Sequence, residues 1–212
     1  MAGILDLLNS DLGKTIISGV AGSTGQDENK TSGLLTMALP VLMQAMKRNA
    51  ATPEGAEGLM GALKNKHNGS ILDDLGGLFS GGVNDEVVND GSKILGHVLG
   101  NKQQGVEKVL SEKSGMDSSS VGNILKVAAP ILMGVLGKQT QQNNVSSPSD
   151  LGGLLGGLLG GNDSQNEQNF LEKILDADGD GSVVDDVAGM LLGGNKKKGG
   201  LGSLLGGLFG GK

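Results

Sequence analysis

The sequence predicts an all-α protein, built of tandem small helical-bundle repeats and followed by a Gly/Leu-rich tail of short helices. Three observations lead to this prediction. Leucines recur at the three- and four-residue spacing of one helix face, the strict apolar–polar alternation of strands is absent, and one helical unit occurs twice. Forty glycines among 212 residues, with only three aromatic side chains, all Phe, set the composition apart from that of an average globular chain.

The repeated unit occupies residues 25–48 and 115–138, which align without a gap at an offset of 90 positions. The segments share seven identical residues, at Gly25/Gly115, Asp27/Asp117, Leu35/Leu125, Ala38/Ala128, Pro40/Pro130, Leu42/Leu132 and Met43/Met133. With its helical flanks, the pattern predicts a repeat domain over residues 1–138 with two related units, 4–49 and 92–139.

Each unit is predicted to contain one helix, a glycine that ends it, an aspartate that starts the next, and a long apolar helix. Gly25 and Gly115 suit the left-handed position after a helix C-terminus. Asp27 and Asp117 suit the N-cap, where a carboxylate accepts from the free amides of the first turn. Pro40 and its counterpart lie inside the apolar helix, which they kink or restart. A helix that is apolar on nearly every face is expected to be buried.

Three shorter helices are expected between the copies, in residues 54–66, 70–79 and 84–99. The polar tract 139–150, rich in Gln, Asn and Ser, is interpreted as a linker and as the main domain boundary.

Residues 151–212 contain 18 glycines, yet their leucines are regularly spaced. One helix face is formed by Leu151, Leu154, Leu155, Leu158 and Leu159, and the pattern returns at Leu201, Leu204, Leu205, Leu208 and Phe209. A similar spacing of apolar residues occurs earlier in the chain, at Ile71, Leu72, Leu75, Leu78 and Phe79. Glycines spaced four apart allow close helix association. Interior glycines also weaken a helix, so an association helix and a weakly ordered tail both stay open.

The strongest chemical motif is a calcium-type loop at residues 176–187, DADGDGSVVDDV. Carboxylates at alternate positions, followed by a glycine turn, are typical of calcium ligands. The loop resembles those of EF-hands and dockerin half-hands, although position 12 is Val187, so one of two earlier aspartates would have to complete the shell. A solvated acidic turn is the alternative. The expected Ca²⁺ ligands are Asp176, Asp178, Asp180, Ser182 (through its carbonyl), Asp185 and Asp186.

The glycine, the aspartate cap and the apolar helix of the form LLxxxxPxLM together resemble the YidB-like bacterial domain of unknown function. The matching segments are GMDSSSVGNILKVAAPILMGVLGK and, less closely, GQDENKTSGLLTMALPVLMQAM. With the helical flanks, the resemblance covers about residues 4–138. It implies a small all-helical bacterial domain, often repeated, and supplies no catalytic residues.

Charge and composition narrow the function classes. A net charge of −6 and the near absence of aromatic residues for base stacking argue against nucleic-acid binding. The absence of cysteine rules out disulfides and thiolate chemistry. No signal peptide or transmembrane helix is recognised, so a cytoplasmic location is the default, with signal-independent export left open. His67 and His97 have no accompanying nucleophile motif, so we expect no enzyme.

These observations predict a non-enzymatic, calcium-stabilised helical interaction or structural protein that binds a protein partner or itself. The alternative is a membrane-active or pore-forming oligomer that uses its Gly/Leu helices. Each Gly/Leu segment is too short to span a bilayer, but association with a membrane surface stays open.

Overall fold

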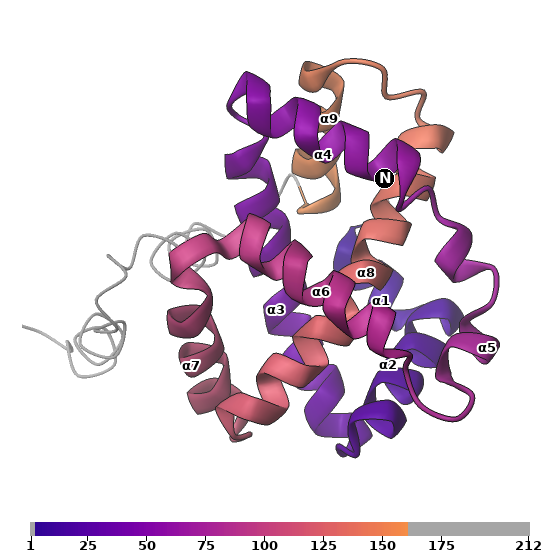
Figure 1. Cartoon of the computed structure of the whole chain (residues 1–212), viewed down its shortest axis with the longest axis vertical. Coiled ribbons are helices and arrows are strands. Elements are labelled where there is room, and N and C mark those ends of the chain that lie inside the picture. The colour runs from indigo at the N-terminus through magenta and orange to yellow at the C-terminus, as the bar shows by residue number, and fades with distance from the viewer. Residues whose placement is uncertain (1–2, 161–212) are drawn as a thin grey trace, which may run out of the picture.

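A computed structural model describes residues 3–160 of the protein (Figure 1), and every regular element in this part is helical. The all-α prediction is therefore confirmed. The elements in order are α1 (Ile4–Asn9), α2 (Asp11–Thr24), α3 (Glu28–Asn49), α4 (Pro53–Asn65), η1 (Ser70–Leu72), α5 (Leu75–Phe79), α6 (Asp85–Leu99), η2 (Gly100–Lys102), α7 (Gln103–Ser114), α8 (Ser118–Gln142) and α9 (Pro148–Leu158).

The glycines and aspartates that the sequence assigned to helix ends and starts occupy these positions in the structure. Gly25 ends α2 and Gly115 ends α7, both with φ of 66°, a left-handed conformation that favours glycine. Asp27 accepts a hydrogen bond from the Lys30 amide at 3.0 Å, and Asp117 accepts one from the Ser120 amide at 2.9 Å. These caps start α3 and α8. That the helix pairs α2–α3 and α7–α8 are two copies of one repeated unit stays a prediction.

The prolines of the two long helices do not restart them. Pro40 lies within α3 and Pro130 within α8, and each helix is continuous across its proline. Of the shorter helices expected between the two copies, residues 54–66 and 84–99 form α4 and α6. The helix expected over residues 70–79 is instead divided into the 3-10 helix η1 and the short helix α5, because Asp74 caps a new helix start.

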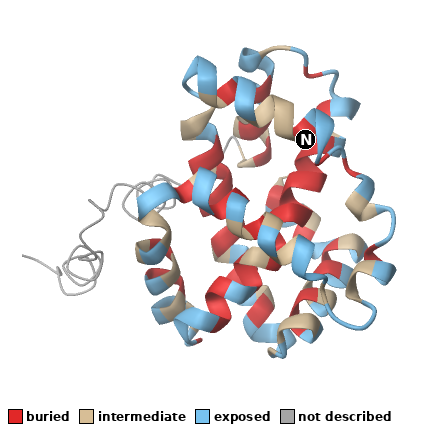
Figure 2. Cartoon of the chain, in the orientation of Figure 1, coloured by how far each residue is buried: buried red, intermediate tan, exposed pale blue. Residues whose placement is uncertain are grey.

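Helix α8 is the centre of the core. It packs against α2, α3, α4, α6, α7 and α9, and Figure 2 shows buried residues along most of its length. Two glycines allow very close backbone contact: a Cβ at Gly91 of α6 would lie 1.8 Å from the Lys126 carbonyl oxygen, and one at Gly137 would lie 1.7 Å from that of His67. These contacts fix the distances of α6 and of the segment after α4 from α8.

The length and hydropathy of α8 would suffice for a membrane span, and among the described residues it is the one helix of this kind. However, 83% of its apolar 18-residue window is buried inside the protein. Packing against other helices therefore accounts for its apolar character.

The predicted linker does not separate the first Gly/Leu segment from the helical body, which corrects the expected boundary at 139–150. Residues 139–142 are the last turn of α8, and α9 follows after a short connection. Helix α9 packs against α3, α4 and α8. The reason is hydrophobic: Leu151, Leu154, Leu155 and Leu158 all belong to the same core as the preceding helices.

Candidate functional site

Helix α9 shows how a Gly/Leu segment binds to the body. Ser147 caps the helix by accepting from the Asp150 amide at 3.3 Å, and Pro148 occupies its first turn. Leu151 and Leu155 are fully buried. Apart from the adjacent residues and the backbone of α9 itself, no heavy atom of the described residues would lie within 4 Å of a Cβ at Gly152 or Gly153. The leucines therefore dock inward, and these two glycines do not mediate a close helix contact within the body.

Helix α5 is a second docked Gly/Leu segment. Asp74 caps it by accepting from the Gly77 amide at 2.7 Å, and Leu75 is buried. The Phe79 ring lies on Gly19 of α2, so close that a Cβ there would be 2.1 Å from a ring carbon. Because Gly19 has no side chain, the Phe79 ring can pack directly against the backbone of α2.

An open groove of about 570 Å³ runs between α2 and α5. Its lining is formed by Lys14, Thr15, Ser18, Gly19, Gly22 and Ser23 of α2 and by Leu75, Gly76 and Phe79 of α5. Gly22 is exposed and has open space where a Cβ would stand. The groove therefore combines an apolar wall from α5 with a helix surface of small residues.

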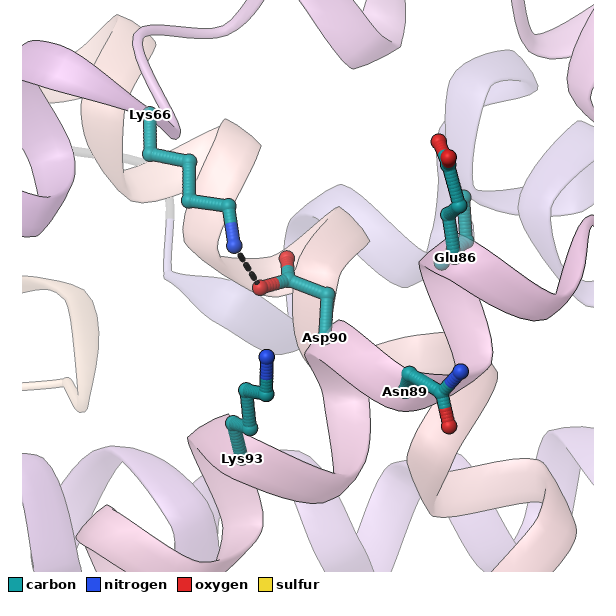
Figure 3. A pocket seen from close by; sticks show the side chains of 6 residues that line it. Lys66, Glu86, Asn89, Asp90 and Lys93 are labelled. Carbon is teal, nitrogen blue, oxygen red and sulfur yellow. Dashed lines mark hydrogen bonds and ion pairs between the residues drawn. The ribbon is translucent and has the colours of Figure 1, made fainter.

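A polar pocket of about 470 Å³ lies between the C-terminal end of α4 and helix α6. Figure 3 shows Lys66 paired with Asp90, the Lys93 side chain directed toward the same pair, and Glu86 and Asn89 further along α6. His67 also contacts Asp90, with its Nε2 3.5 Å from the second Asp90 carboxylate oxygen. Asp90 thus links the segment after α4 to α6.

Burial lowers the pKa of His67 below its usual value, and the nearby Lys66 ammonium lowers it further, while Asp90 acts in the opposite direction. The imidazole is 7% exposed and is neutral at pH 7. No serine, threonine or cysteine lines this pocket. The arrangement supplies a partly shielded carboxylate between a lysine and a histidine, which suits a structural tie between helices.

The stability of the protein is expected to fall as the pH drops below about 6.5. There the unfolded chain binds a proton at His67 more readily than the folded protein does, because burial lowers the pKa of His67 in the folded state, so the free energy of unfolding decreases by at most ~1.4 kcal/mol per pH unit. Urea unfolding between pH 5 and 8 measures this slope. His67→Gln should flatten it, and His97→Gln, which changes an exposed histidine of α6, should not. Equal slopes for both variants would contradict the assignment.

The predicted calcium ligands all lie outside the described residues, so the metal site stays a prediction. Within residues 3–160, no group of three or more His, Asp or Glu side chains could hold a metal ion. The sequence did not predict the contact between the His67 imidazole and the Asp90 carboxylate. The adjacent Lys66 and His67 gave no signal for their partner, because Asp90 comes from another helix.

The comparisons with known proteins identify a family. No curated protein and no solved structure matches the chain. The family model described as "Bacterial protein of unknown function (DUF937)" matches residues 6–139, more than half of the chain. The match runs from α1 into α8 and leaves α9 outside. The chain therefore belongs to the DUF937 family of bacterial proteins of unknown function.

Proposed function

We propose that this protein is a non-enzymatic interaction protein whose Gly/Leu segments are docking elements for helical surfaces. The docking of α9 is the observation that carries the proposal. Its leucines are buried against α3, α4 and α8, while two of its glycines face open space. Residues 201–209, LGSLLGGLF, match residues 151–159, LGGLLGGLL, at every position that α9 buries: Leu151, Leu154, Leu155 and Leu158. Such a segment has the apolar face needed to bind another helical surface.

Within the DUF937 family, the resemblance to YidB-like domains supports the placement of this chain among small all-helical bacterial domains. The buried positions of α3 and α8 come from the segments that carry this resemblance.

Calcium is the second part of the proposal. The loop 176–187 lies between the two Gly/Leu segments 151–159 and 201–209. Ca²⁺ held by Asp176, Asp178 and Asp180, with the Ser182 carbonyl and Asp185 or Asp186, would tie the flanking sequences FLEKIL and VAGMLL together. The support is the spacing of the aspartates and the glycine at position 6 of the loop.

The membrane-active alternative has less support. The described Gly/Leu segments use their leucines inside the protein, and α8 is buried in the core. Release of a dye from liposomes is the measurement for this alternative.

Self-association through residues 201–209 is expected to depend on the leucines of this segment. Leu205 corresponds to the fully buried Leu155, so Leu205→Asp should lower the average mass at high protein concentration. Ser203 corresponds to the exposed Gly153, so Ser203→Asp adds the same charge as a matched control and should leave the mass unchanged. Light scattering over a concentration series of the full chain makes the comparison. The same mass for both variants would contradict self-association through this segment.

A further inference from the structure

We propose that the groove between α2 and α5 is the docking site for residues 205–209 of the same chain. This inference rests on the proposed function, because it takes a Gly/Leu segment to be a docking element. The groove contains an apolar wall, Leu75 and Phe79, beside the open position of Gly22.

The first step is a sequence identity. Residues 75–79 and 205–209 are both LGGLF. The structure shows how this pentapeptide binds α2: Leu75 is buried, and the Phe79 ring lies on the bare backbone of Gly19. The α2 surface therefore already binds the phenylalanine ring of this pentapeptide sequence.

The second step is that Gly22, like Gly19, offers a position on α2 without a side chain, but this position is not covered. Gly22 follows Gly19 by three residues, and residues three apart in a helix share a face. Phe79 covers Gly19, whereas, apart from the adjacent residues and the backbone of α2 itself, no described atom lies within 4 Å of a Cβ at Gly22. The groove volume of about 570 Å³ is in the range of sites that hold a small ligand. A second aromatic ring, that of Phe209, fits beside Phe79 at this position.

The third step is the connection between the groove and its occupant. Residues 161–204 join α9 to the docking segment. These 44 residues can span at most ~145 Å when fully extended, which is several times the ~15 Å radius of gyration expected for a body of this size. The segment can therefore reach the groove of its own chain. The effective concentration of such a tethered segment is on the order of millimolar, so binding within the chain dominates at micromolar protein.

Disulfide trapping tests the proposal, because the chain contains no cysteine. Ser23→Cys places a thiol in the groove, and Gly210→Cys places one directly after Phe209. In the full chain at low micromolar concentration, this pair should form an intramolecular disulfide about tenfold faster than Gly33→Cys with Gly210→Cys. Gly33 is a matched control, because it is exposed on α3 and has open space for a side chain. Non-reducing gels and mass spectrometry of the linked peptides identify the product.

A second variant separates docking from random collision. Gly22→Glu in the Ser23/Gly210 cysteine pair should slow disulfide formation to the rate of the Gly33 pair, because it places a charge in the vacant position. The open space at Gly22 lets the variant fold, which circular dichroism verifies. Equal rates for the two cysteine pairs, or no effect of Gly22→Glu, would overturn the proposal.

The outcomes also distinguish this inference from the proposed function. Disulfide-linked dimers without an intramolecular product, together with a mass that falls in Leu205→Asp, overturn docking within the chain and leave the interaction role standing. A fast intramolecular disulfide, together with an unchanged mass in Leu205→Asp, supports the docking site and contradicts self-association.

Discussion

Leu132→Asp is expected to unfold the helical body. Leu132 lies on α8 and is 2% exposed, so the variant loses the leucine contacts and buries a carboxylate. Loss of a buried leucine side chain costs about 2–5 kcal/mol, and the unpaired charge adds several more. This total is comparable to the whole stability of a typical domain, ~5–15 kcal/mol. Loss of the helical signal in circular dichroism and loss of the cooperative thermal transition are the measurements.

Leu5→Asp is the control for this variant. Leu5 is 41% exposed on α1, so the same substitution leaves the new carboxylate in water and should cost little stability. A folded, fully helical Leu132→Asp protein would contradict the assignment of α8 as the central core helix.

Calcium is expected to bind the full chain and to release or absorb measurable heat. Five aspartates within residues 176–186 repel one another without a cation, and a divalent ion relieves this repulsion. The flexible carboxylate and carbonyl ligands expected here suit Ca²⁺ better than Mg²⁺, which demands a stricter octahedron. At a calcium concentration of about 100 times Kd, binding would stabilise the bound conformation by ~2.7 kcal/mol.

Isothermal titration calorimetry of the full chain is the appropriate measurement, since the protein has no Trp or Tyr to sensitise terbium. Asp178→Ala and Asp180→Ala should each abolish the heat. Asp163→Ala removes a carboxylate outside the loop and should leave the heat unchanged. Absence of heat from the unaltered chain at millimolar calcium would show that residues 176–187 are only an acidic turn.

Local chemistry made the helices predictable from the sequence. Gly25, Asp27, Gly115 and Asp117 mark the ends and starts of helices because a left-handed residue and an N-cap act within one turn of the backbone. The leucine spacing of residues 151–159 likewise predicted both a helix and its apolar face. These features depend on residues close together in the chain, so one sequence is enough to find them.

The candidate sites were less predictable. Of the groove between α2 and α5, the sequence identified only the Gly/Leu pattern of residues 71–79, and it gave no reason to place Phe79 on Gly19. The polar pocket was missed because Asp90 meets His67 only through the packing of α6 beside the end of α4.

The sequence by itself determined the helical class, the capped ends and the apolar faces of this protein. Only the tertiary structure decided that α9 belongs to the helical body, that Gly91 and Gly137 are contact points with backbone carbonyls, and that His67 is buried beside Asp90. The physical reason is the range of the interactions. Caps and helix periodicity act within a few residues, whereas burial and close backbone contact depend on which distant helices share the core.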